Sequence, residues 1–271
     1  MAKILLDKYY TPPDLAEYIV NKTKLIIGEE NISEYLKPSA GTGVFLDYLD
    51  KPYLAYDIEP DDKRNRIVKR DFLELDLDYK KGRCVIGNPP FGEKNNLTVS
   101  FYKKLIHICD YISFILPISQ YKNDIKLYEF DLIYSEDLGI YTYTDINIHC
   151  CLNIFNRPIN NILNKKSNNK LKDVEIIEIR LGNKQVKDYD IRICAWGGYK
   201  DGNSGIGNEV KYENQYAKEF CIKVYNEKYK NEIIELIKNA DWRKLYPMTA
   251  SPNLTQWQVY KYIKEQIPEI S

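Results

Sequence analysis

In the first part of the chain, segments with the apolar spacing of a helix alternate with short apolar runs typical of strands. Between residues 13 and 27 apolar residues recur at positions 15, 16, 19, 20 and 26, with Asp14 near the start, which predicts an amphipathic helix. Strands alternating with helices favour the α/β class, here a doubly wound and mostly parallel sheet. The predicted strands are 32–36, 53–56, 67–69, 84–86 and 111–116, and further helices are predicted at 43–50 and 97–109.

The pattern changes in the second half of the chain. Residues 141–155 contain two strand-like runs with no helix between them, which predicts an antiparallel hairpin at one edge of the sheet. Residues 160–172 are polar and basic and predict a linker or mobile loop. We therefore expect two domains, residues 1–158 and 159–271. The second is predicted to be of α+β type, with strands within 173–225 and helices at 226–239 and 254–266.

Composition says more about the environment of the protein than about its function. The 39 basic residues balance 39 acidic ones, so any surface that binds nucleic acid must be a local patch. No Cys-x-x-Cys pair occurs and only two histidines could join the cysteines at a metal, so we expect reduced, buried thiols and no metal. The cysteines are Cys84, Cys109, Cys150, Cys151, Cys194 and Cys221.

The chain has no segment that predicts contact with a membrane. No apolar stretch approaches the roughly 18 residues that span a bilayer, and the first residues lack the apolar core of a signal peptide. We expect a soluble, cytoplasmic protein without a membrane partner.

A glycine pair marks a candidate ligand loop between a predicted strand and a predicted helix. Gly41 and Gly43 let the backbone approach a ligand closely, although the third glycine of the dinucleotide fingerprint is missing. The next strand ends near Asp57, whose carboxylate could bind both hydroxyls of a ribose, and Asp71-Phe72 follows the third strand. Since parallel strands end at one edge of a sheet, these groups predict a nucleoside site there.

A second stretch, Val85-Ile-Gly-Asn-Pro-Pro-Phe, leaves an apolar strand through two consecutive prolines. Each proline fixes its own φ near −65° and restricts the residue before it, so the pair makes a stiff, extended exit from the strand. A plain turn accounts for Pro89 and Pro90. It does not account for the amide of Asn88 and the ring of Phe91 on either side of them.

Together these stretches resemble the amino-methyltransferases that use S-adenosylmethionine, most closely the adenine-N6 DNA methyltransferases with the motif order called γ. The resemblance covers residues 9–158. It implies a Rossmann-like class I methyltransferase domain, S-adenosylmethionine as cofactor, duplex DNA as partner, and a bacterium or the host cell of a phage or virus as the setting. The residues that it implies in cofactor binding are Tyr10, Thr11, Pro12, Pro38, Ser39, Ala40, Gly41, Thr42, Gly43, Asp57, Ile58, Asp71, Phe72 and Asn88.

The catalytic residues implied by the resemblance are Asn88, Pro89, Pro90 and Phe91. The amine of adenine is a poor nucleophile because its lone pair is delocalised into the ring. The Asn88 side-chain oxygen and the Pro89 carbonyl would each accept one amine hydrogen and aim the lone pair at the methyl sulfonium. Phe91 would stack on the base after it is flipped out of the duplex. Phe155 matches a second aromatic on the other side of the base, with a core phenylalanine as the alternative.

One residue departs from the resemblance. The family usually has Asp or Glu directly before the Pro-Ser-Ala-Gly segment, where the acid helps to hold the methionine moiety of the cofactor, whereas this chain has Lys37. A lysine cation there would repel the ammonium and the sulfonium of the cofactor unless its side chain turns away. Asp57 and the backbone of Thr11 and Pro12 would then carry more of the cofactor binding.

Residues 159–271 are the candidate target-recognition region by position. They include a glycine-rich loop, 196–207, in which Trp196, Tyr199 and Lys200 combine aromatic faces with charge that could follow a groove or fill an emptied stack. An ordinary hairpin loop is the alternative. The sequence leaves open which DNA sequence is recognised and whether a companion restriction enzyme exists.

Three other functions fit parts of the pattern. The two acceptors at Asn88 and Pro89, which together form a clamp for an amine, also suit other planar amines. N4-cytosine, an RNA base or a protein glutamine is therefore an alternative target. Pro60-Asp61 followed by Asp78-Tyr79-Lys80 matches the loose pattern of a Mg²⁺-dependent nuclease, a match that a highly charged chain produces by chance. The third alternative is a nucleic-acid binder without activity, which Lys37 would favour.

Overall fold

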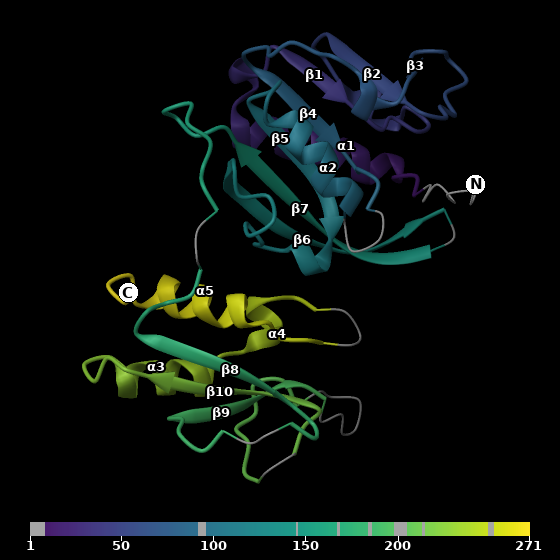
Figure 1. Cartoon of the computed structure of the whole chain (residues 1–271). Coiled ribbons are helices and arrows are strands. Elements are labelled where there is room, and N and C mark those ends of the chain that lie inside the picture. Colours follow the sequence, from purple (N-terminus) through teal and green to yellow (C-terminus); the bar gives the residue numbers. More distant parts are fainter. Residues whose placement is uncertain are drawn as a thin grey trace. The chain divides into compact units, whose positions relative to one another are not determined.

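The chain forms two compact units, Met1–Lys166 and Ser167–Ser271, each described by itself (Figure 1). The first unit extends beyond the predicted border at residue 158 because two side chains hold its last segment. Arg157 Nε donates to Asp110 Oδ1 at 3.1 Å, and Asn164 Nδ2 donates to Asp131 Oδ1 at 2.7 Å. The computed structural model describes residues 9–91, 96–144, 146–166, 169–183, 186–197, 205–212, 215–248 and 252–271.

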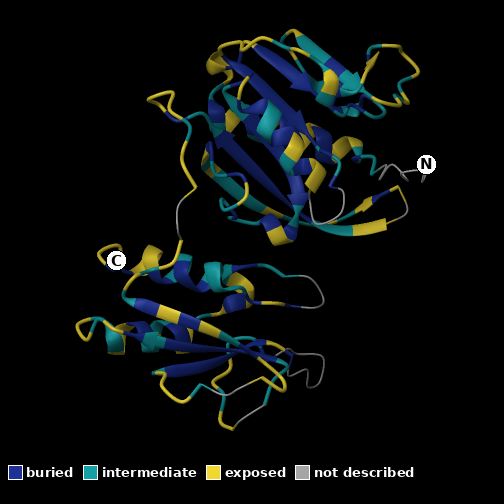
Figure 2. Cartoon of the chain, viewed as in Figure 1, coloured by how far each residue is buried: buried dark blue, intermediate teal, exposed yellow. Residues whose placement is uncertain are grey.

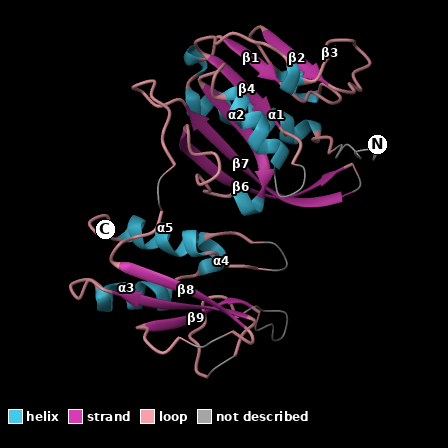
Figure 3. Cartoon of the chain, in the orientation of Figure 1, coloured by secondary structure: helices cyan, strands magenta, loops and turns pink. Residues whose placement is uncertain are grey.

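The first unit contains a seven-stranded sheet with the order β3-β2-β1-β4-β5-β7-β6. All neighbouring strands are parallel except β7, which is antiparallel to both β5 and β6. The strand order turns back at β1 and β4, so the predicted fold class is confirmed: a doubly wound, mostly parallel sheet with an antiparallel edge pair (Figure 3). The strands are β1 (Glu34–Lys37), β2 (Tyr53–Asp57), β3 (Val68–Lys69), β4 (Arg83–Gly87), β5 (Tyr111–Pro117), β6 (Asp131–Tyr143) and β7 (Ile146–Asn156).

Two helices cover opposite faces of this sheet. Consecutive residues of β1 point to opposite faces, as expected for a strand buried on both sides: Tyr35 packs with α1 and Leu36 packs with α2. The central strand β4 is buried along its whole length (Figure 2). The connecting elements are α1 (Pro13–Ile27), η1 (Glu29–Asn31), η2 (Val44–Tyr48), η3 (Phe72–Glu74), α2 (Asn96–Leu105) and η5 (Ile118–Gln120), where η marks a 3₁₀ turn.

Helix α1 forms where the spacing of apolar residues predicts it. Pro13 opens it at a position where a missing N–H costs nothing. The helix ends at Gly28, whose φ of +85° a residue with a side chain would adopt only with strain. Its buried stripe consists of Leu15, Ala16, Ile19, Val20, Thr23 and Ile27.

Two predicted elements differ from the structure. The helix expected at 43–50 is the short 3₁₀ turn η2, which follows a left-handed Gly43 and ends at an extended Leu49. The predicted hairpin is longer than 141–155, because β6 already begins at Asp131. Its pairing with β7 shifts register after Leu132 and again after Asp137, and these irregularities hide the alternation that marks a regular strand.

The second unit is a three-stranded antiparallel sheet of order β8-β10-β9 with helices packed against it. Its core joins the strands to α3, α4 and α5, and Trp242 is one of its largest buried side chains. This is the predicted α+β region. The elements are β8 (Val174–Arg180), β9 (Ile191–Trp196), β10 (Lys218–Val224), α3 (Lys230–Asn239), α4 (Trp242–Leu245) and α5 (Gln256–Gln266).

All six cysteines are buried and unpaired, as the sequence predicts. Burial raises the pKa of the Cys150 thiol to about 11, which disfavours the reactive thiolate. Within the described ranges, no helix has the length and apolar character needed to cross a bilayer.

Candidate functional site

A cavity of about 290 Å³ opens at the edge of the sheet where β1, β2 and β4 end. Most residues predicted for the site meet there, from five separate stretches of the chain. Of the predicted residues, those lining the cavity are Tyr10, Pro38, Ser39, Gly41, Asp57, Ile58, Asp71, Phe72, Asn88, Pro89 and Pro90. Thr11, Pro12, Ala40, Thr42, Gly43 and Phe91 belong to the same stretches but do not line it.

The loop after β1 is held tightly to the end of β2. Gly41 N–H donates to Asp57 Oδ2 at 2.7 Å, and Glu59 N–H donates to Asp57 Oδ1 at 2.8 Å. Gly41 has a φ of +56°, and a Cβ there would lie 3.3 Å from the ring of Tyr10. Each carboxylate oxygen of Asp57 keeps a further lone pair, so the acid can still accept hydrogen bonds from a ligand in the cavity.

The third strand end supplies an apolar wall. Asp71 Oδ1 accepts a hydrogen bond from Leu73 N–H at 2.8 Å, which caps η3. The Phe72 ring lies 5.3 Å from the Phe101 ring, and Lys104 Nζ lies 5.3 Å from the centroid of Phe72. The Lys104 ammonium also donates to the carbonyls of Leu73 and Leu75, so this wall has a fixed shape.

Asn88 carries the most unusual polar atom of the site. Its Nδ2 donates to the Tyr9 carbonyl at 3.2 Å, which fixes the orientation of the amide. Its Oδ1 is buried and, among the described residues, has no hydrogen-bond partner. Leaving a buried acceptor unpaired costs about 1–3 kcal/mol, so this oxygen is set up to accept a hydrogen bond from a ligand.

The rest of the Asn-Pro-Pro-Phe stretch is held from two sides. Ser39 Oγ donates to the Asn88 carbonyl at 3.3 Å, and Thr98 Oγ1 donates to the Pro90 carbonyl at 3.1 Å. Gly87, with a φ of +149°, turns the chain out of β4 just before Asn88. This stretch is therefore connected to the loop after β1 on one side and to α2 on the other.

Tyr9 is a site residue that we did not predict. Its ring stacks with that of Phe91 at a centroid distance of 6.0 Å and an interplanar angle of 25°. Its carbonyl is the acceptor that orients Asn88. The signal in the sequence is its place two residues before Thr11, in the stretch that the resemblance covers. Other lining residues that we did not predict are Glu59, Leu73, Leu97 and Phe101.

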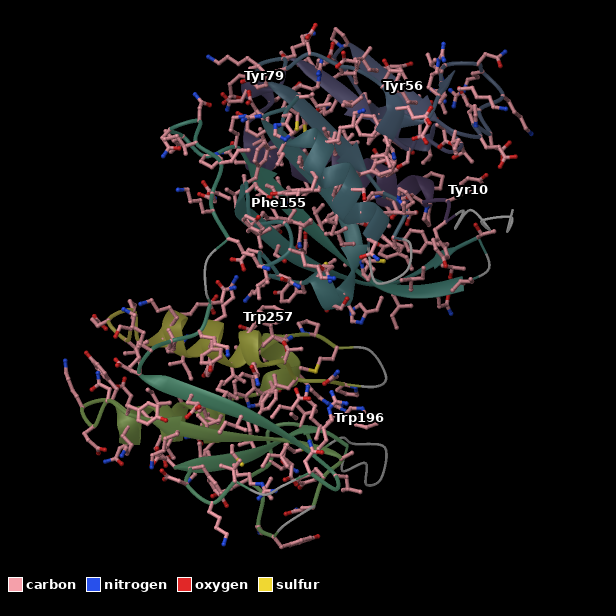
Figure 4. All side chains as sticks on the ribbon, viewed as in Figure 1. Tyr10, Tyr56, Tyr79, Phe155, Trp196 and Trp257 are labelled. Carbon is pink, nitrogen blue, oxygen red and sulfur yellow. The ribbon has the colours of Figure 1, made fainter. Side chains whose placement is uncertain are left out.

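Phe155 does not contribute to the site, which corrects our assignment. The side chain lies in β7 (Figure 4) and is fully buried. It packs edge-on against Tyr102, with the two ring centroids 5.7 Å apart. Its backbone pairs with Ile112 of β5 on one side and Leu132 of β6 on the other. Because it is part of the core between the sheet and α2, it cannot stack on a ligand.

Lys37 turns away from the cavity. Its Nζ donates to the Ser39 carbonyl at 2.5 Å and lies 5.0 Å from the centroid of Phe45, and the residue is only 3% exposed. Burial lowers the pKa of Lys37 to about 8, while the Asp57 carboxylate acts in the opposite direction. The Lys37 side chain is therefore turned away from the cavity, which is the arrangement in which a cation at this position does not point at a bound ligand.

The residues predicted for target recognition lie in the second unit. Trp196 ends β9 (Figure 4). Its side chain is 39% exposed. Tyr199 and Lys200 lie outside the described residues. Trp257 packs edge-on against Tyr246 at 5.7 Å within the core of this unit. The described residues contain no group of acidic, histidine and cysteine side chains that could hold a metal ion.

Comparison with known proteins gives two kinds of match. The Type II methyltransferases M.HincII and M.HindII of Haemophilus influenzae are each 31% identical to this chain over 107 residues. The match covers 38% of this chain but only 20% of each relative, so the chain spans about a fifth of their length. This similarity confirms the resemblance to methyltransferases that the motifs predict. No protein-family model matches the chain.

Solved structures of methyltransferases superpose on part of the chain. The candidate RNA methyltransferase PH1948 from Pyrococcus horikoshii is 17% identical, with a TM-score of 0.45, and covers 58% of this chain and 90% of its own. The N-methyltransferase NodS from Bradyrhizobium japonicum, in complex with S-adenosyl-L-homocysteine, is 13% identical, with a TM-score of 0.42, and covers 56% and 90%. The strand order of the first unit is itself that of the Rossmann-like class I methyltransferase fold.

Proposed function

We propose that this chain transfers a methyl group from S-adenosylmethionine to the exocyclic N6 of adenine in DNA. The observation that carries the proposal is the buried Oδ1 of Asn88, which has no hydrogen-bond partner within the described ranges and is fixed as an acceptor by the bond from Nδ2 to the Tyr9 carbonyl. An amine hydrogen of a planar base would satisfy it. The similarity to two Type II methyltransferases supports the same class of reaction.

The cavity has the groups that the cofactor needs. Asp57 offers two carboxylate oxygens to the ribose, and the Gly41 backbone lets the ligand approach closely. Ile58, Phe72 and Leu97 supply apolar walls for the adenine ring. When bound there, S-adenosylmethionine supplies a methyl carbon whose bond to sulfur breaks as its bond to the amine nitrogen forms.

Asn88 and Pro89 act on the amine. Asn88 Oδ1 and the Pro89 carbonyl each accept one hydrogen of N6, which holds the nitrogen lone pair toward the methyl group. Because Pro89 and Pro90 lack N–H groups, no backbone donor of these two residues competes for the lone pair. Positioning and electrostatics carry this reaction. Asn88 takes up no proton, so the proton that the nitrogen finally loses passes to water.

The two rings beside the clamp suit a planar target. Tyr9 and Phe91 are nearly parallel, and both are positioned by the chain segments that hold the Asn88 amide. A base that enters from a duplex must first leave its stack, and contact with these rings offsets part of that cost. The second unit, with Trp196 exposed at the end of β9, is the proposed target-recognition region.

The test is transfer of labelled methyl from S-adenosylmethionine to duplex DNA, single-stranded DNA, total RNA and protein in parallel, with EDTA present. We expect N6-methyladenine in DNA alone, by nucleoside analysis of the product. Label in cytosine, RNA or protein would contradict the assigned target while leaving the clamp intact. If folded protein transfers no methyl group to any of these acceptors, the proposed methyltransferase activity is wrong.

Asn88→Ala is the decisive variant. We expect transfer to fall by at least about 100-fold, as on loss of a positioned oxyanion-type contact. Binding of S-adenosylhomocysteine should persist, because the Asn88 backbone carbonyl that contacts Ser39 remains. Asn31→Ala is the matched control, since Asn31 is exposed in the connection between α1 and β1, away from the cavity. Full activity of Asn88→Ala would refute the clamp.

A further inference from the structure

Lys37 is a buried lysine with fewer partners than its ammonium can use. The Nζ group has three hydrogens, whereas the described residues give it one acceptor, the Ser39 carbonyl at 2.5 Å. The face of Phe45 provides a further weak contact at 5.0 Å. A fully charged ammonium is therefore poorly compensated at this position.

The ammonium lies directly behind the wall of the cavity. Lys37 is the last residue of β1, and its acceptor Ser39 lines the cavity. On the other side it packs against Gly87, where an added Cβ would overlap the end of the lysine side chain. Nζ therefore contacts one lining residue, Ser39, and lies next to Gly87, which precedes a second one, Asn88.

The groups that face Lys37 stabilise its positive charge only weakly. Burial lowers the pKa of Lys37 to about 8, and the carboxylate of Asp57, at the end of β2, raises it in part. The neighbours from η2 and β4 are Phe45 and Gly87, neither of which is charged. The residue is thus mostly protonated at pH 7 in the free protein but close to the point of losing its proton.

The proposed function brings a second cation to the same place. A methyl group can reach an amine held by Asn88 only if the sulfonium that carries it lies near Asn88, on the other side of the wall from Lys37. Like charges separated by a dry wall of protein repel strongly and favour the uncharged form of the titratable partner. The cofactor and a charged Lys37 therefore oppose each other.

We propose that binding of S-adenosylmethionine expels the proton of Lys37 to solvent, so that the lysine acts as a neutral positioning residue that holds the Ser39 carbonyl. This inference rests on the proposed function. The neutral amine keeps hydrogens for the bond to Ser39, so the loop stays in place while the opposing charge disappears. Transfer of the methyl group leaves a neutral sulfur, which allows Lys37 to regain its proton.

The proposal predicts a linkage between pH and cofactor affinity. Since the proton is lost on binding, affinity should rise by about tenfold per pH unit below pH 8 and level off above it. The amino group of the cofactor titrates in a similar range, so its contribution must be removed by comparison with a lysine variant. Lys37→Met is that variant, because methionine matches the unbranched stem without a charge.

The test is isothermal titration of the whole chain with S-adenosylmethionine at pH 7 in two buffers of different ionisation enthalpy, which counts released protons. We expect wild type to release close to one proton more than Lys37→Met, and Lys24→Met, in the last turn of α1, to match wild type. Lys37→Gln serves if a thermal melt shows that the methionine variant is misfolded.

A second measurement uses the wild-type protein alone. S-adenosylhomocysteine lacks the sulfonium charge, so it should release fewer protons than S-adenosylmethionine. Equal proton release for wild type and Lys37→Met, or for the two ligands, would overturn this proposal and leave the proposed function standing. Absence of S-adenosylmethionine binding by folded wild-type protein would overturn both.

Discussion

At the scale of single residues, the site depends on oxygen atoms that the protein leaves partly unused. Asn88 Oδ1 has no partner among the described residues, and each Asp57 carboxylate oxygen accepts one backbone N–H. The hydrogen bonds that the Asn88 amide and the Asp57 carboxylate already make also fix the orientation of these two side chains. Ligand binding then requires little rearrangement of the side chains, which is the general benefit of preorganisation.

Asp57→Ala should weaken binding of S-adenosylhomocysteine by about 1.5–3 kcal/mol, the range for hydrogen bonds to a charged group. The loss has two sources: the ribose contacts, and the acceptors for Gly41 and Glu59 that hold the loop. Titration calorimetry measures it. Asp57→Asn keeps one acceptor and should lie between wild type and Asp57→Ala, and unchanged affinity in the alanine variant would show that this acid does not contact the ligand.

Tyr9→Leu tests whether the Tyr9 ring beside Asn88 contributes to binding of the target base. We expect kcat/KM for DNA to fall by an amount equivalent to about 1–3 kcal/mol, the usual contribution of one aromatic stacking contact to a base. Tyr9→Phe keeps the ring and the backbone carbonyl that orients Asn88, so it should remain close to wild type. Equal activity of Tyr9→Leu and Tyr9→Phe would remove Tyr9 from target binding.

The sequence places residues at the cavity where their position follows from the end of a strand. Asp57, Asp71 and Asn88 all follow short apolar runs, and all three line the cavity. Phe155 lies within an apolar run, so its sequence context fits either a core or a stacking residue. Tyr9 depends on its contact with Asn88, 79 positions further along the chain, which local sequence does not report.

At the scale of elements, the end of β4 is constrained at Gly87. Gly87 has a φ of +149°, which is costly for any residue with a side chain, and a Cβ there would also overlap Lys37. Gly87→Ala should therefore lower the free energy of unfolding by about 1–3 kcal/mol and displace Asn88. Urea unfolding measures the first effect and methyl transfer the second.

Gly139→Ala is the matched control for that variant. Gly139 also has a positive φ, +78°, but nothing lies within 4 Å of an added Cβ. Its loss of stability should therefore be smaller and its effect on transfer negligible. Equal losses for the two variants would mean that backbone strain, and not the contact with Lys37, limits position 87.

Element prediction depended on how regular each element is. The helix over 13–27 and the five parallel strands have clear apolar patterns, and the structure has all of them within a few residues. The prediction of a helix at 43–50 was wrong because Gly43 and Leu49 confine the segment to a single short turn. The first part of β6 was missed because its two register shifts break the period of two.

At the scale of the whole molecule, the cavity is built entirely from the first unit. All of its lining residues fall between Tyr9 and Phe101, and the unit extends to Lys166. A fragment of residues 1–166 should therefore bind S-adenosylhomocysteine as the full chain does but transfer methyl groups to DNA far more slowly, because the proposed recognition region is missing. Titration calorimetry and labelled transfer measure the two properties.

The converse result would also be informative. A fragment that folds but loses cofactor affinity would show that the second unit supports the cavity directly. Full transfer by the fragment would remove the second unit from target recognition. The zero net charge of the chain gives no guide here, since it sums over both units.

The bond between Asn88 and the Tyr9 carbonyl has a practical consequence for handling the protein. The amide that the proposed chemistry depends on is oriented by a residue that lies just ahead of α1, close to the start of the numbered chain. A substitution or insertion that moves the backbone at Tyr9 would therefore act on the amide itself, and a protein altered in this way would bind ligand normally while turning over poorly.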